Sequence, residues 1–140
     1  VQIVKLLTKL APVVMFSAAI PFQGGTGHIN EQWASYWAKL FIDQGYVPVD
    51  YLRSLIWTHP DIPTYYKQNI LFYIKEDELE RYPALKANYD ASQGDMLDVI
   101  HPGTIERIHV RQALKLLRRA VSNAIAKRVN RQQMEERAAP

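Results

Sequence analysis

The stretch Val13-Val14-Met15-Phe16-Ser17-Ala18-Ala19-Ile20-Pro21, followed by Gly24-Gly25-Thr26-Gly27, predicts a strand that runs into a flexible loop. Val13–Phe16 is a short, continuous apolar run, which is typical of a strand buried on both faces, as in a parallel sheet. The glycines that follow are typical of a loop. This strand and loop therefore favour an α/β fold.

A helix is expected directly after the loop, over Asn30–Asp43. Asn30 is a candidate N-cap, and Glu31 suits the positive end of the helix dipole. Gly45 is well placed to end the helix. One helix face collects the apolar side chains of Trp33, Tyr36, Trp37, Leu40 and Phe41.

The flanking segments extend this alternation of helices and strands. Val1–Leu10 has the pattern of the last turns of a helix, which Pro12 limits. Tyr46–Trp57 is expected to contain a strand, with a β-rich stretch over Tyr51–Trp57, and Asn69–Lys75 is expected to form another. No clear crossover helix separates the last two strands, which leaves an antiparallel pairing open to them.

The chain divides by pattern into two parts. Residues 1–75 are expected to form an α/β domain, and residues 76–140 a helical C-terminal extension. Within the extension, Glu76–Asn88 suits a short, charged helix that Pro83 interrupts. Gly103 or Thr104 then begins a long helical pattern.

The positive charge belongs to the C-terminal part of the chain. Residues 103–140 contain nine Lys or Arg and three Glu, a net charge of +6, whereas residues 1–102 carry a net charge of −3. A basic helix is therefore expected over residues 103–135.

The composition limits the classes of site. The 140 residues contain no cysteine, which excludes disulfides, thiolate zinc sites and a cysteine nucleophile. This composition fits a reducing compartment, and we expect a cytoplasmic protein. No uninterrupted apolar run reaches the ~18–20 residues of a membrane span.

Several motifs resemble those of bacterial class I S-adenosylmethionine-dependent methyltransferases. The principal motif is Phe-Ser-Ala-Ala-Ile-Pro-Phe-Gln-Gly-Gly-Thr-Gly-His-Ile-Asn-Glu-Gln-Trp, which spans Phe16–Trp33. Ser54–Trp57, Tyr66–Ile70 and Val99–Pro102 resemble the same group. The resemblance covers nearly the whole chain and is firmest over residues 10–75.

The resemblance implies the last three strands of a Rossmann-like, seven-stranded sheet. Val13–Ala18 would be its fifth strand, Tyr46–Trp57 would contain the sixth, and Asn69–Ile74 would be the seventh, inserted antiparallel. The glycine-rich loop and the acidic residue that hold S-adenosylmethionine in this family would lie ahead of Val1. We therefore expect the isolated chain to be inactive and to expose a sheet edge that pairs with a missing N-terminal half or with a second copy.

The loop Gly24–Gly27 lies between a strand and a helix, which is also the setting of phosphate-binding loops. Its spacing does not match Gly-x-Gly-x-x-Gly, which would need a glycine at Asn30. A substrate-side loop is therefore favoured over a phosphate site. The resemblance implies the same, because this loop covers the acceptor pocket in the family.

His28 is the candidate catalytic residue. A neutral histidine can take a proton from an acceptor hydroxyl or amine near neutral pH. The alternative is a loop histidine that only packs or caps. The junction of loop and helix at the carboxyl end of a strand makes His28 the first choice for an acid–base or acceptor-orienting role.

Other polar residues are candidate acceptor contacts. Asn30 and Glu31 could contact a polar acceptor, although capping and dipole effects explain both residues as well. Gln23 is a weaker loop candidate. The resemblance alone adds Tyr66 and Gln68, with Tyr65 and Asn69 beside them. No metal is expected, since the spacing of the histidines matches no pattern of metal ligands.

The basic C-terminal helix leaves three interpretations open. Its apolar stripe could pack on the body of the protein or on a second copy, which is the favoured case. Its basic face could meet nucleic acid or an anionic membrane surface. The absence of aromatic residues after Gly103 supports neither base stacking nor deep membrane insertion.

Two main functions follow from these patterns. The first is part of a methyltransferase that acts on a small-molecule or sugar acceptor, with this chain contributing the acceptor-side loop. The second is a non-enzymatic fragment or binding module that associates through its sheet edge and basic helix. A nucleic-acid-binding accessory domain is a third, less favoured hypothesis.

Overall fold

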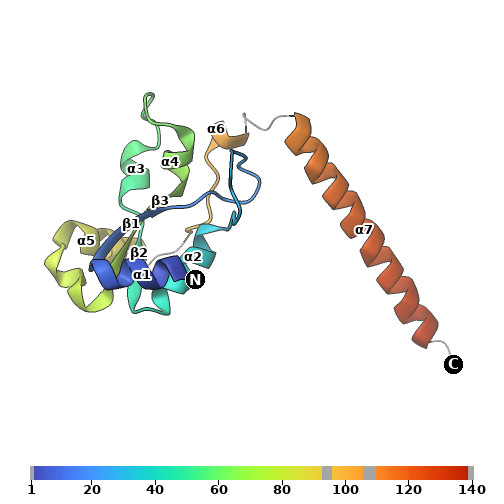
Figure 1. The fold of residues 1–140 in the computed structure, drawn as a ribbon, viewed down its shortest axis with the longest axis horizontal. Coiled ribbons are helices and arrows are strands. Elements are labelled where there is room, and N and C mark those ends of the chain that lie inside the picture. Colours follow the sequence, from blue (N-terminus) through green and yellow to red (C-terminus); the bar gives the residue numbers. More distant parts are fainter. Residues whose placement is uncertain (1, 93–95, 106–109, 139–140) are drawn as a thin grey trace. The chain divides into compact units, whose positions relative to one another are not determined.

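The computed structural model describes residues 2–92, 96–105 and 110–138. The chain forms two compact units, Val1–Arg107 and Ile108–Pro140. The first unit is an α/β structure and the second contains helix α7, Val110–Ala138 (Figure 1). The long helical pattern expected from Gly103 begins as a separate short helix, α6, over Pro102–Ile105. Residues 106–109 lie outside the described part of the chain.

The α/β unit is built on a three-stranded sheet. Its strands are β1 (Val13–Ser17), β2 (Tyr46–Val49) and β3 (Ile70–Lys75), in the order β1-β3-β2. The central strand β3 is antiparallel to both neighbours, so the antiparallel pairing left open for the last two strands is confirmed. The expectation that Val13–Phe16 is buried on both faces is wrong. Met15 is 59% exposed and Val14 is buried, so the two faces of this strand differ in burial.

Helices pack on both faces of the sheet. Helix α1 (Gln2–Leu10) and helix α2 (Ala34–Ile42) contribute to one apolar cluster. The 3-10 helix η1 (Glu76–Arg81) and helix α5 (Pro83–Ser92) contribute to the other. The first cluster contains Val4, Val14, Trp37, Ala38, Phe41, Tyr46, Leu71, Tyr73 and Leu97. The second contains Val47, Val49, Ile74 and Leu79.

Aromatic side chains fill the centre of the first cluster. The rings of Phe41 and Tyr73 stack with centroids 3.8 Å apart, and Phe16 meets Phe41 edge-on at 5.6 Å. Trp37 lies 5.1 Å from Phe16, measured between ring centroids. The predicted apolar face of the helix is therefore the one that packs on the sheet at Trp37 and Phe41, whereas Tyr36 is exposed.

The N-terminus of α2 differs from the prediction. The helix begins at Ala34, and Asn30 does not cap it. Asp98 takes that role: its carboxylate accepts hydrogen bonds from the Ser35 N–H at 2.8 Å and from the Ser35 hydroxyl at 2.6 Å. A carboxylate in this position satisfies a free amide and opposes the positive end of the helix dipole. The cap is thus a tertiary contact.

Two short helices lie beyond β2. Helix α3 (Leu52–Ile56) replaces the β-rich stretch expected over Tyr51–Trp57, and helix α4 (Thr64–Asn69) was not expected. On α3, the buried Arg53 donates to the Asp50 carboxylate, three residues back. That spacing suits a helical turn, and β-propensity is a weak preference that such contacts override.

Helix α7 carries exposed apolar side chains. Leu114, Leu117, Val121 and Ile125 are each at least half exposed, at spacings of three and four residues. No helix in the described part of the chain is both long enough and apolar enough to span a membrane.

Burial of Tyr73 predicts a loss of stability at alkaline pH. Burial raises the pKa of Tyr73 well above its ordinary value of 10.0, although the charge of Arg53 opposes the shift. Above pH 10 the unfolded chain releases this proton while the folded chain keeps it, so the free energy of unfolding falls by up to about 1.4 kcal/mol per pH unit. Urea unfolding measures the free energy of unfolding below pH 10 and at about pH 11. Its fall between these two pH values should be smaller in Tyr73→Phe than in the wild-type protein. An equal fall in both proteins would contradict this assignment.

Candidate functional site

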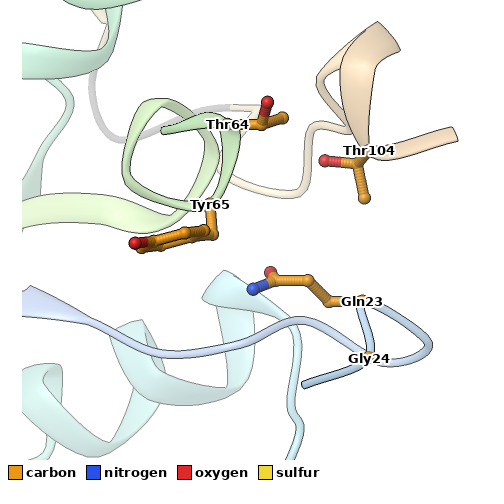
Figure 2. Close-up of a pocket in the computed structure, with 5 residues that line it drawn as sticks. All are labelled: Gln23, Gly24, Thr64, Tyr65 and Thr104. Carbon is orange, nitrogen blue, oxygen red and sulfur yellow. The ribbon is translucent and has the colours of Figure 1, made fainter. Parts of the chain in front are cut away.

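A small pocket lies at one edge of the sheet, where three segments meet. It is lined by Gln23 and Gly24 from the loop after β1, by Thr64 and Tyr65 from the start of α4, and by Thr104 from α6 (Figure 2). Ser17 at the end of β1 pairs with Ile70 at the start of β3, so the β1 loop and α4 meet at this edge. The volume is about 90 Å³. The pocket therefore has room for waters or for one functional group of a ligand.

Gln68 forms the base of this region. It is 1% exposed. Its side-chain oxygen accepts hydrogen bonds from the His101 N–H at 2.9 Å and the Thr104 hydroxyl at 2.8 Å, and its amide nitrogen donates to Asn69 and Gln23. An amide side chain has two donors and two acceptor positions, and all four are used. Gln68 therefore fixes the pocket wall and is not available to a substrate, in contrast to its predicted role.

Gln23 joins the loop to this network and lies in the pocket lining. Its side-chain oxygen accepts from Asn69 Nδ2 at 2.7 Å and from Gln68 Nε2 at 3.3 Å. Figure 2 shows its side chain extending from the loop toward Tyr65. Of the predicted substrate-binding residues, Gln23 is the one placed in the pocket lining.

His28 and Glu31 form a pair on the loop after β1, and neither residue is among those that line the pocket. His28 Nδ1 lies 3.2 Å from one carboxylate oxygen of Glu31, and the other carboxylate oxygen accepts the Phe22 N–H at 3.1 Å. About a third of the His28 side chain is exposed. Both carboxylate oxygens of Glu31 thus contact the loop, and Glu31 does not begin the helix as the sequence suggested.

The loop that carries this pair contains a tight turn and a close backbone contact. The Gln23 N–H donates to the Ile20 carbonyl at 3.2 Å, which makes a turn with Pro21 and Phe22 at its centre. Phe22 has a φ of 72°, which is rare for a bulky residue. Gly25 lies against the His28 ring, since a Cβ atom there would be 2.6 Å from His28 Cε1. Its φ of 134° favours glycine, and a side chain at this position would also displace the His28 ring.

The remaining predicted contacts lie elsewhere. Asn30 is exposed, and its side-chain oxygen accepts from Gln32 Nε2 at 3.0 Å. The Tyr66 ring packs against Tyr65 with centroids 4.7 Å apart, and Tyr66 is half exposed. Neither residue lines the pocket, so their predicted role as acceptor contacts gains no geometric support.

His101 has a structural place under α6. Its Nε2 lies 2.9 Å from the Trp57 carbonyl, and its Nδ1 accepts the Gly103 N–H at 3.1 Å. These two contacts require a neutral ring that carries its proton on Nε2. Within the described residues, no three histidine or acidic side chains gather as a group that could hold a metal ion.

Arg53 connects three segments beside the site by hydrogen bonds. Its guanidinium donates to the Asp50 carboxylate at 2.8 and 2.6 Å and to the backbone carbonyls of Leu97 at 2.9 Å and Gln68 at 3.3 Å. The forked guanidinium suits this bidentate pairing. One side chain therefore connects the end of β2, the end of α4 and the segment that carries Asp98.

Sequence reasoning missed Thr64 and Thr104 as pocket residues. Isolated threonines carry no pattern that distinguishes them from surface residues, and the contact of the Thr104 hydroxyl with Gln68 joins residues that are 36 positions apart. Comparisons with known protein families, with curated proteins and with solved structures gave no match to the chain.

Proposed function

We propose that this chain forms the acceptor side of a class I S-adenosylmethionine-dependent methyltransferase acting on a small-molecule or sugar acceptor. The strand order β1-β3-β2 carries the proposal. Because β3 is antiparallel to both neighbours, β1 and β2 are parallel to each other, with α2 between them in sequence. The last three strands of a class I methyltransferase sheet have this order and direction.

The position of the pocket supports the same proposal. In open α/β sheets, ligands bind at the carboxyl ends of the parallel strands. Gln23 and Gly24 follow the carboxyl end of β1, and His28 lies on the same loop. The acceptor would enter here, with His28 as the group that takes its proton.

The residues present do not fit S-adenosylmethionine by themselves. A Cβ atom at Gly25 would lie 2.6 Å from His28 Cε1, so this part of the glycine loop packs on the ring of its own histidine. The Ser35 N–H at the start of α2 already donates to Asp98. The N-terminus of α2 is thus already occupied by a side chain of the protein. We propose that the donor contacts come from residues outside this chain.

The test is methyl transfer by the protein as its gene encodes it. Radiolabelled S-adenosylmethionine and a panel of sugars and small hydroxyl, amine and thiol metabolites should show transfer of label to at least one acceptor. His28→Ala should lower kcat by about 10²–10⁴-fold, because general base catalysis contributes that much. His59→Ala is the matched control, since His59 is exposed and its Nδ1 accepts only the nearby Asp61 N–H among the described contacts.

Two results would contradict the proposal. One is the absence of transfer to every acceptor. The other is saturable binding of S-adenosylmethionine to the 140-residue chain in calorimetry, which would place the donor site within these residues. The codons ahead of Val1 give a first check, because the proposal requires them to encode a strand followed by a glycine-rich loop.

A binding module is the second candidate, and helix α7 favours it. Its apolar residues Leu114, Leu117, Val121 and Ile125 are exposed, while Arg118, Lys127 and Arg128 on the same helix are exposed cations. Such a helix can pair with a second helix or lie on an anionic surface. Two results together would favour this function over methyl transfer. The protein would show no transfer of a methyl group, and its complex would dissociate when α7 is deleted.

A further inference from the structure

The contacts of Glu31 determine which nitrogen of His28 carries the proton. A carboxylate accepts hydrogen bonds and donates none. One oxygen of Glu31 accepts the Phe22 N–H, and the other lies 3.2 Å from His28 Nδ1. In the neutral ring, this contact requires the proton on Nδ1. The lone pair is then on Nε2.

The ring is held on a second side by the loop backbone. A Cβ atom at Gly25 would lie 3.0 Å from His28 Nε2 and 3.1 Å from Nδ1, so the imidazole packs against the Gly25 backbone. Gly24, the neighbouring residue, lines the pocket. Within the described part of the chain, Nδ1 of His28 has a hydrogen-bond partner and Nε2 has none. The orientation of the ring is therefore set from two sides, by Glu31 and by the Gly25 backbone.

We propose that Glu31 is a positioning residue that holds His28 in the Nδ1–H form, so that Nε2 accepts the proton of a hydroxyl-bearing acceptor. The hydroxyl O–H bond breaks, its proton forms the new bond to Nε2, and the electron pair stays on the oxygen, which becomes the nucleophile. Glu31 then offsets the positive charge of the imidazolium. The hydroxyl assignment rests on the proposed function.

The chemistry of the acceptor explains the choice of a hydroxyl. A neutral amine already has a free lone pair, and a thiol ionises close to neutral pH. A hydroxyl oxygen is a weak nucleophile until an adjacent base removes its proton. A histidine oriented by a carboxylate is therefore most useful to an alcohol, such as a sugar hydroxyl.

Nitrogen-15 NMR of histidine side chains tests the positioning role on the 140-residue chain, without any need for activity. His28 should carry its proton on Nδ1, with its signal assigned by its loss in His28→Ala. His101 is an internal control of opposite form, since its Nδ1 accepts the Gly103 N–H. In Glu31→Gln the amide can still accept the Phe22 N–H and would present its NH₂ group to Nδ1, so His28 should change to the Nε2–H form while His101 stays unchanged.

A wild-type His28 with its proton on Nε2, or a His28 that keeps the Nδ1–H form in Glu31→Gln, would overturn the positioning role. The hydroxyl assignment has its own test in the complete protein. Glu31→Gln should lower kcat for hydroxyl acceptors at least about tenfold with little change in KM, since it alters the proton acceptor and not the pocket lining. Transfer to amines or thiols alone would overturn that assignment. Absence of all transfer would count against the proposed function and the hydroxyl together, whereas the NMR result would stand.

Discussion

Replacing Arg53 with alanine is expected to lower the free energy of unfolding by about 3 kcal/mol, because it removes the buried partner of a partly exposed carboxylate and one donor from each of two backbone carbonyls. Arg53 is 2% exposed. Its removal leaves the Asp50 carboxylate without its two charged hydrogen bonds and removes a donor from the carbonyls of Leu97 and Gln68. Each buried group left unsatisfied carries its own desolvation cost.

Thermal unfolding followed by circular dichroism measures this effect. A loss of this size in a unit of about 100 residues should lower Tm by more than about 10 °C. Lys39→Ala is the surface control: Lys39 lies 3.6 Å from Asp43 in an exposed pair, whose loss should cost less than about 1 kcal/mol. A change of Tm in Arg53→Ala as small as that of Lys39→Ala would refute the role of Arg53.

The same substitution should loosen a distant part of the fold. Arg53 holds the Leu97 carbonyl, and the next residue, Asp98, caps α2. Hydrogen exchange at the Ser35 amide should therefore accelerate in Arg53→Ala. Arg53→Lys keeps the charge, so its loss of stability should be smaller than that of Arg53→Ala. Some loss should remain, because lysine cannot reproduce the forked contacts.

Replacing Phe41 with alanine is expected to destabilise the α/β unit by about 3–5 kcal/mol, the range for a buried aromatic residue. Phe41 has no exposed surface and stacks on Tyr73 with ring centroids 3.8 Å apart. The alanine leaves a cavity between α2 and β3 and also removes the edge contact with Phe16.

Urea unfolding of Phe41→Ala beside Ile42→Ala separates burial from helix propensity. Ile42 is the next residue of α2 and is 54% exposed. Its substitution by alanine should change stability by less than about 1 kcal/mol, since surface substitutions have small effects. Equal losses in the two variants would show that α2 does not pack as described.

Much of the architecture was predictable from local patterns. The helix over Val1–Leu10, the strands at Val13 and Asn69, and the apolar face of α2 each have a periodicity that repeats within one element. Burial of Trp37 and Phe41 followed from their spacing. The helical turn over Leu52–Ile56 was missed, because Ile56 and the flanking aromatic residues Tyr51 and Trp57 favour a strand when tertiary contacts are left out.

The candidate site was predictable only in part. His28, Glu31 and Gln23 were selected from one contiguous loop, and all three have contacts within it. Their roles were not readable from the sequence. Glu31 looked like a residue of the helix N-terminus, and Gln68 looked like a substrate contact, but the partners of both side chains depend on how the chain folds back.

The sequence by itself determined α1, α2, the three strands and the loop that carries His28, because periodicity and glycine content are local properties. The tertiary structure decided which strand is central, which side chains are satisfied and what caps α2. Asn30 was the local candidate for that cap, yet Asp98 occupies it from 63 residues away. Hydrogen-bond partners of polar groups are chosen by proximity in the folded chain, and no local pattern encodes a contact over that separation.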